Sequence, residues 1–164
     1  MPRTRTTRVS NHDVIDGICY MLIILGGWPN YAPLYDKAAD HRNAFDLSMW
    51  QALKWLEFKY REMGREEDVH AHFRPHWLYW TSETVQGAVS QMLGFAFYMR
   101  SPFGRGVYYC QIGTETAERM LEWNAIDREL LEELTRRFRR EYDFAAEDRE
   151  WPPDFDFNHE LGRA

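Results

Sequence analysis

Residues 47–64, with the sequence LSMWQALKWLEFKYREMG, decide the class of fold. Their large apolar side chains recur at steps of three and four residues, which places them on one face of an α-helix. These side chains are Leu47, Trp50, Leu53, Leu56, Tyr60 and Met63. Gly64 comes next, and glycine commonly follows the last residue of a helix. The pattern predicts a helix that begins at Asp46 or Ser48, ends at about Met63 and buries one face in a core.

The same spacing recurs on both sides of this segment and predicts four further helices. Residues 26–44 separate the first two helices and contain prolines and glycines, so we expect a loop there. The expected helices are 10–25 with Ser10 as its cap, 82–99 with Ser82 as its cap, one that starts with Thr114 as its cap, and one from Asn124 or Asp127 to about Tyr142.

Two stretches change from a helical pattern to that of short strands. Within residues 69–81, the apolar Val69, Ala71 and Phe73 alternate with polar residues, a step of two that is typical of a strand. Residues 107–112 (VYYCQI) are β-branched and aromatic. We therefore predict a mainly α fold (α+β), with about five helices and two or three short strands flanking the third helix.

The chain divides into three regions by composition. Its 164 residues suit one domain, and 45% of them are apolar, which is enough to build a core. We expect a flexible basic arm over residues 1–9, a single globular helical domain over 10–142, and an acidic-aromatic tail over 143–164.

Bulk charge and hydropathy exclude two classes of partner. The net charge of −6 is opposite to that of a typical nucleic-acid-binding domain, so no direct DNA reading is expected. The longest apolar run, Ile18–Leu25, is far shorter than the ~20 residues that span a bilayer, so no membrane association is expected.

Cys19 and Cys110 each lie in an apolar run and are predicted to be free thiols, which indicates a cytoplasmic protein.

Three histidines form a candidate metal site. His70 and His72 would share one face of a strand, and His76 lies four residues further on. Imidazoles bind zinc with a carboxylate or water completing the shell, and Asp68 and Glu83 are the nearest candidate carboxylates. Zinc is the cofactor that this arrangement would hold, although the rest of the chain requires no cofactor.

Arg65 and His70 form a second candidate site. Their Arg-x4-His spacing resembles the pattern of HEPN ribonucleases, which are small helical bundles. The resemblance covers six residues. It implies that His70 transfers a proton and that Arg65 holds the RNA phosphate.

The last two predicted helices offer two further possibilities. Residues 114–134 have the outline of a helix-turn-helix, but Asp127, Glu129 and neighbouring carboxylates would repel phosphates, so an ordinary helical pair is expected. Arginines cluster near the end of the last helix, where the helix dipole favours cations, and they also offer a surface for an anionic partner. These arginines are Arg136, Arg137, Arg139 and Arg140.

The tail has the composition of a docking segment. Its carboxylates are interleaved with large aromatic side chains, which are unfavourable when fully solvated and serve as anchors at interfaces. The candidate partner-binding residues are Trp151, Asp154, Phe155, Asp156 and Phe157. These residues would pack either on the chain's own domain or on a partner with a basic surface.

These observations favour a non-enzymatic interaction protein over an enzyme. The expected function is an accessory adaptor or inhibitor that docks on a basic, nucleic-acid-handling protein, or a chain that associates with a second copy of itself. Two alternatives stay open: a small helical hydrolase or ribonuclease, metal-dependent through the histidines or HEPN-like through Arg65 and His70, and a virion or assembly subunit.

Overall fold

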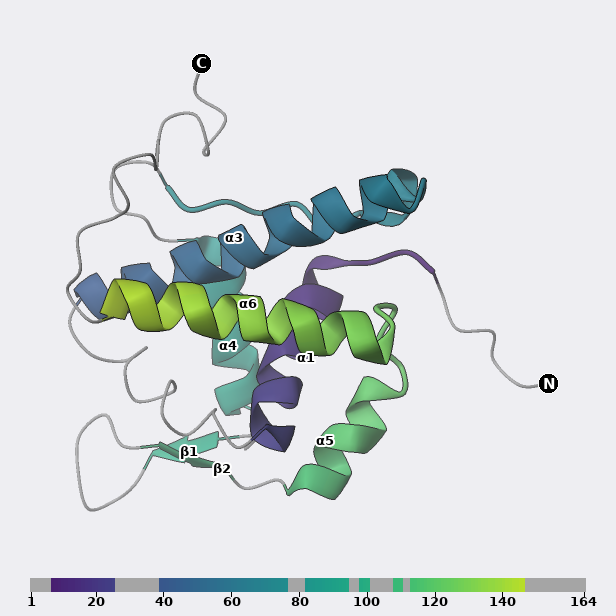
Figure 1. Ribbon diagram of the computed structural model, residues 1–164. Coiled ribbons are helices and arrows are strands. Elements are labelled where there is room, and N and C mark those ends of the chain that lie inside the picture. The colour runs from purple at the N-terminus through teal and green to yellow at the C-terminus, as the bar shows by residue number, and fades with distance from the viewer. Residues whose placement is uncertain are drawn as a thin grey trace.

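The computed structural model describes residues 7–25, 39–76, 82–94, 98–100, 108–110 and 113–146 (Figure 1). In these residues the chain is mostly helical, as predicted. The five α-helices are α1 (Asn11–Ile24), α3 (Ala39–Glu62), α4 (Glu83–Gly94), α5 (Thr114–Leu121) and α6 (Arg128–Ala146), and η1 (Glu66–Asp68) is a short 3₁₀ helix.

Helix α1 begins where the sequence predicts. Ser10 is its N-cap, and its hydroxyl oxygen accepts a hydrogen bond from the backbone amide of Asp13 at 3.2 Å. The Asp13 carboxylate in turn accepts the backbone amide of Ser10 at 2.8 Å, which completes a capping box. Along α1, Val14, Ile15 and Ile18 are fully buried in the core.

Helix α3 is longer than predicted. It starts at Ala39, within the stretch expected to be a loop, and the predicted start at Asp46 or Ser48 is wrong. The reason is tertiary: Phe45 and Asp46, which the earlier start includes, are both fully buried. The other end agrees with the prediction, because α3 ends at Glu62 and Gly64 has a left-handed φ of 68°.

Helices α3 and α6 lie side by side across one face of the molecule (Figure 1). Aromatic rings fill their contact. The ring of Phe45 meets that of Phe138 edge-on at 5.3 Å, and Phe138 stacks on Tyr142 at 5.9 Å. All three side chains are at most 1% exposed, so this contact belongs to the core.

Residues 69–76 do not form the predicted strand. Val69 makes a single isolated bridge with Val9, and no regular pairing continues from it. The predicted alternation is nevertheless present, since Ala71, Phe73 and Pro75 are buried and the residues between them are exposed. The segment therefore lies extended on the core, and the described residues provide no partner strand for it. Residues 77–81 of the predicted strand region lie outside the described residues.

Val9 is anchored although it belongs to the predicted arm. Its backbone donates to the carbonyl of Asp68 and accepts from the amide of His70, both at 2.8 Å, and the side chain is fully buried. The described structure therefore includes the end of the arm in the core, while residues 1–6 lie outside it.

A short hairpin follows α4. The strands β1 (Tyr98–Arg100) and β2 (Tyr108–Cys110) pair antiparallel, with Met99 opposite Tyr109. Helix α4 ends at Gly94 and so does not reach Met99 as predicted. The predicted set of two or three strands around the third helix stays a prediction, since residues 95–97, 101–107 and 111–112 lie outside the described part.

The start of α4 is fixed by a buried carboxylate of α3. The Oδ2 atom of Asp46 accepts the backbone amide of Ser82 at 2.8 Å and the side-chain amide of Gln86 at 3.3 Å. Ser82 also accepts the amide of Val85 through its hydroxyl at 3.4 Å, as an N-cap does. The predicted cap at Ser82 is therefore confirmed.

The last two helices differ from prediction at their ends. Gly113, rather than Thr114, is the N-cap of α5. Helix α6 starts at Arg128, directly after the predicted cap Asp127, but it continues to Ala146, four residues into the predicted tail. Among the described residues, no helix combines the length and the apolar character that a bilayer span requires.

Candidate functional site

The turn between α5 and α6 is held against the start of α1 by hydrogen bonds. Asn124 donates through Nδ2 to the backbone carbonyl of Asp13 at 2.8 Å and accepts the amide of Ile126 through Oδ1 at 2.9 Å. Asp13 Oδ1 accepts the amide of Ala125 at 3.2 Å. The same carboxylate that caps α1 therefore also fixes this turn.

Two exposed apolar side chains stand next to this turn. Trp123 is 65% exposed and Met120, three residues earlier, is 48% exposed. Glu122 and Asp127 are exposed beside them in the sequence and carry carboxylates. We refer to Met120, Glu122, Trp123 and Asp127 as the corner surface. Its backbone is held by the contacts of Asn124, so the tryptophan is presented from a fixed position.

A pocket of about 200 Å³ lies beside the corner surface. Its lining residues are Glu118, Leu121, Glu122, Ile126, Arg128 and Leu131. Arg128 donates to both carboxylate oxygens of Glu118, at 2.5 and 2.7 Å, and so bridges α5 to α6. These hydrogen bonds lower the pKa of Glu118, which keeps its carboxylate ionised and paired and unsuited to act as a general acid.

The three histidines of the predicted metal site are all exposed. The backbone amide of His72 donates to Asn11 Oδ1 at 2.7 Å, which ties the extended segment to α1. Within the described residues, no three His, Cys, Asp or Glu side chains come together in a way that could hold a metal ion. The zinc hypothesis for His70, His72 and His76 therefore receives no geometric support and stays an untested prediction.

Arg65 of the HEPN-like pair is engaged in local contacts. Its Nε donates to Asp68 Oδ2 at 3.0 Å, and its guanidinium lies over the ring of Tyr60 at 5.1 Å. The hydrogen bond to Asp68 raises the pKa of Arg65. In this position Arg65 fastens η1 to the end of α3, while His70 is exposed.

Three titratable groups gather on α1. Asp16 forms an ion pair with His12 at 3.4 Å, and burial raises the pKa of its carboxyl although His12 opposes the effect. Burial raises the pKa of Cys19 well above its ordinary value, and it raises that of Tyr20 to about 12. Cys19 is fully buried, as predicted, so it is an inert thiol and not a nucleophile.

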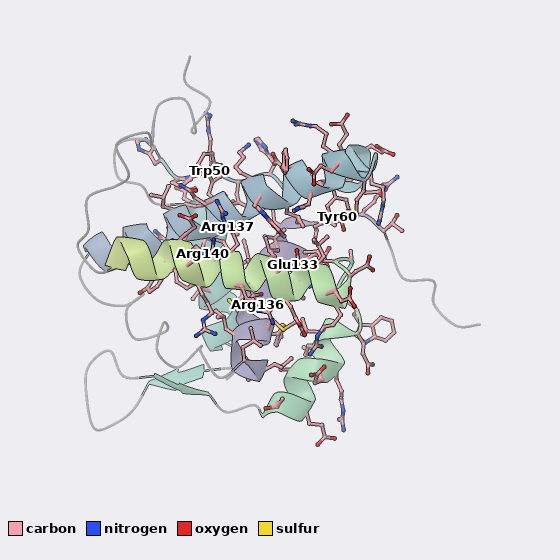
Figure 2. All side chains as sticks on the ribbon, viewed as in Figure 1. Trp50, Tyr60, Glu133, Arg136, Arg137 and Arg140 are labelled. Carbon is pink, nitrogen blue, oxygen red and sulfur yellow. The ribbon has the colours of Figure 1, made fainter. Side chains whose placement is uncertain are left out.

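The arginines of α6 are not at the end of their helix. Because α6 continues to Ala146, its last turn contains no basic residue, and the interpretation of these arginines as partners of the helix dipole is wrong. Arg137 pairs with Glu141 at 3.3 Å, and Arg136 lies 3.8 Å from Glu132. Figure 2 labels Arg136, Arg137 and Arg140 along α6.

The predicted docking residues of the tail fall outside the described structure. They are Trp151, Asp154, Phe155, Asp156 and Phe157. Sequence reasoning treated Trp123 only as part of a break between two helices. The signal that could have identified it is a tryptophan in the short turn of an amphipathic helical pair, where a buried position is hard to reach.

Comparison with known proteins provides no relative on which to base a function: no family model matches the chain, and neither does any curated protein or solved structure. The function proposed below therefore rests on the chemistry of the described residues.

Proposed function

We propose that the protein is a non-enzymatic protein–protein interaction module of the cytoplasm. In this proposal it acts as an accessory adaptor or inhibitor that docks on a basic surface of a nucleic-acid-handling partner. The observation that supports it is the corner surface, where Trp123 is 65% exposed and Glu122 and Asp127, close to it in the sequence, are exposed as well.

An exposed tryptophan side chain is unfavourable in water, and its burial at an interface contributes binding free energy. Tryptophan is among the residues most enriched at binding hot spots, where it fills a pocket on the partner. Carboxylates around such an anchor attract a partner with basic side chains and suppress acidic ones. The corner surface therefore fits an apolar pocket with a basic rim.

The tail supports the proposal through its composition. Like the corner surface, the tail combines large apolar side chains with carboxylates. Its sequence places Trp151, Phe155 and Phe157 close to Asp154 and Asp156. We propose the tail as a second docking segment for the same basic partner. Helix α6 extends through residue 146, so the segment to test is 147–164 and not the originally expected 143–164.

Several titratable groups that could have suggested catalysis have structural explanations, which also favours a binding role. Arg128 and Glu118 pair with each other, Arg65 pairs with Asp68, and Cys19 is sealed in the core. A carboxylate or guanidinium held in an ion pair, and a thiol sealed in the core, are poorly placed to act as an acid, a base or a nucleophile.

The test compares Trp123→Ala with Phe58→Ala, a matched control on α3 whose ring is 52% exposed. The full chain is immobilised, partners from the native host are quantified by mass spectrometry, and the main partner is then purified and titrated. We expect Trp123→Ala to weaken binding about tenfold or more, the effect of a hot-spot residue, because its anchor is lost. Phe58→Ala should bind as the wild type does.

Removal of residues 147–164 tests the tail in the same titration. We expect affinity to fall further while the circular dichroism spectrum stays helical. Equal affinity of the wild type, Trp123→Ala and the truncated chain for the purified partner would contradict the proposal, as would a partner surface that is acidic.

A further inference from the structure

The outward face of α6 is a row of four charges. Glu129, Glu133, Arg136 and Arg140 are all exposed, and we call them the α6 charge row. The opposite face of the helix is buried and packs on α3 and α1. Its buried residues are Leu131, Leu134, Thr135, Phe138 and Tyr142. Figure 2 shows Glu133, Arg136 and Arg140 along the length of α6, and Figure 1 shows α6 in front of α1 and α4.

Within the row, like charges are neighbours. Glu129 and Glu133 are four residues apart, and so are Arg136 and Arg140, and like charges at this spacing destabilise a helix. The helix dipole does not compensate for this at Arg136 and Arg140, because α6 continues to Ala146 and both precede its last turn. The helix dipole therefore accounts for Glu129, which lies in the first turn of α6, but not for the two neighbouring arginines of the row.

The charges of the row are also poorly paired within the chain. Glu129, Glu133 and Arg140 form no ion pair with another residue in the described part of the structure. Arg136 approaches Glu132 only to 3.8 Å. Their charges remain available to an external partner.

The row is complementary to itself when the helix direction is reversed. Its residues are spaced by four, three and four positions, so the pattern is symmetric about the midpoint between residues 134 and 135. In an antiparallel pair, Glu129 would face Arg140 of the second copy and Glu133 would face Arg136 of the second copy. The two-fold axis of a dimer generates each of these contacts twice.

Within the row itself, no like charges would oppose each other. We propose that the α6 charge row is a self-association surface, on which a second copy of this chain docks antiparallel through its own α6.

The size of the contact determines the strength that we expect. From Glu129 to Arg140 the helix rises by about 16 Å. Such a surface is narrow and charged, and exposed ion pairs contribute little each and are screened by salt. We expect a weak dimer that forms at low salt and high protein concentration and dissociates at high salt.

Charge reversal with rescue tests this inference. Sedimentation velocity of the full chain is measured over a concentration series, at low salt and at about 1 M salt, where the screening length is only ~3 Å. Glu133→Arg places arginine opposite Arg136 of the second copy, and Arg136→Glu places glutamate opposite Glu133. We expect each single variant to weaken dimerisation about tenfold or more.

The double variant Glu133→Arg/Arg136→Glu restores opposite charges and should restore the dimer. An equimolar mixture of the two single variants should also associate, because each supplies the charge that the other needs. Glu67→Arg is the control for Glu133→Arg, since Glu67 is exposed on η1 and its reversal changes the net charge by the same amount. Circular dichroism confirms that each variant is folded.

Three results would overturn the inference: a wild type that is monomeric at low salt, single variants that dimerise as the wild type does, or a folded double variant that stays monomeric. The inference does not depend on the proposed function. Its variants leave the corner surface intact, and Trp123→Ala leaves the α6 charge row intact, so failure of one proposal is distinguishable from failure of the other.

Discussion

At the scale of single residues, Asp13 and Asn124 connect the start of α1 to the turn between α5 and α6. The Asp13 carboxylate accepts the backbone amide of the N-cap Ser10 and that of Ala125. Asn124 in turn donates a hydrogen bond to the backbone carbonyl of Asp13. These contacts require close approach of α1 to the turn. Gly17 permits it, because a Cβ atom at this position would lie 2.6 Å from Asn124 Nδ2 and 3.1 Å from Leu131 Cδ1.

Gly17→Ala tests this close approach. Asn124 is held by hydrogen bonds on both sides and cannot move away freely, so we expect the variant to lose about 1–3 kcal/mol of unfolding free energy. Gly87→Ala is the control, because a Cβ atom there meets nothing within 4 Å and alanine is favoured over glycine in a helix by ~1 kcal/mol. Urea unfolding measures the unfolding free energy of both variants. Equal changes in Gly17→Ala and Gly87→Ala would contradict the close approach at Gly17.

At the scale of elements, the pairing of α3 with α6 determines where α3 starts. Phe45 lies before the stripe that indicated α3, yet its ring packs edge-on against Phe138 and Tyr142. This contact stabilises an additional part of α3 that the local pattern does not predict. Helical stability in proteins comes mainly from such packing of an apolar face and less from intrinsic propensity.

Phe138→Ala tests the aromatic contact between the two helices. The side chain is fully buried, so the variant should lose about 3–5 kcal/mol of unfolding free energy. It should also lose helical signal, because the first turns of α3 depend on this contact. Phe58→Ala, on the exposed side of the same helix pair, should change stability by less than about 0.5 kcal/mol. A Phe138→Ala variant with unchanged thermal and urea unfolding would show that the contact is not formed.

At the scale of the whole molecule, two carboxyl groups shift the pH dependence of stability in opposite directions. Burial raises the pKa of Asp16, and one of its carboxylate oxygens is buried without a hydrogen-bond partner. Hydrogen bonding from Arg128 lowers the pKa of Glu118. Ionised Asp16 therefore destabilises the folded chain, whereas ionised Glu118 stabilises it.

Asp16→Asn should stabilise the protein at neutral pH by about 1 kcal/mol, because the charge in a poorly solvated position is removed. The folded protein binds the Asp16 proton more tightly than the unfolded chain does. The advantage of the variant should therefore shrink as the pH falls through the raised pKa towards the ordinary 3.8.

Glu118→Gln should show the opposite behaviour and serves as the comparison. Its stabilising contribution is present above the ordinary pKa of 4.5 and is lost as the pH falls through the lowered value. Urea unfolding of both variants at neutral pH and near pH 4 distinguishes the signs. A less stable Asp16→Asn variant at neutral pH would refute the assignment.

The sequence by itself determined the helices that have an apolar stripe and a capping signal. The stripe of residues 47–63, the glycine that follows it, and the caps at Ser10 and Ser82 are local features, and local geometry is sufficient to read them. The alternation over residues 69–76 likewise indicated an extended chain with one buried side. It could not show whether a second strand was available, because strand pairing is a contact between distant segments.

Only the tertiary structure decided the features on which the candidate surfaces depend. The early start of α3 follows from the packing of Phe45 on α6, and the continuation of α6 to Ala146 is what removes the arginines from the helix dipole. The exposure of Trp123 follows from the turn between α5 and α6. This turn is held by the contact between Asp13 and Asn124, which are more than a hundred residues apart in the chain. A linear pattern records which side chains are apolar or charged, but burial and pairing are properties of segments brought together by folding.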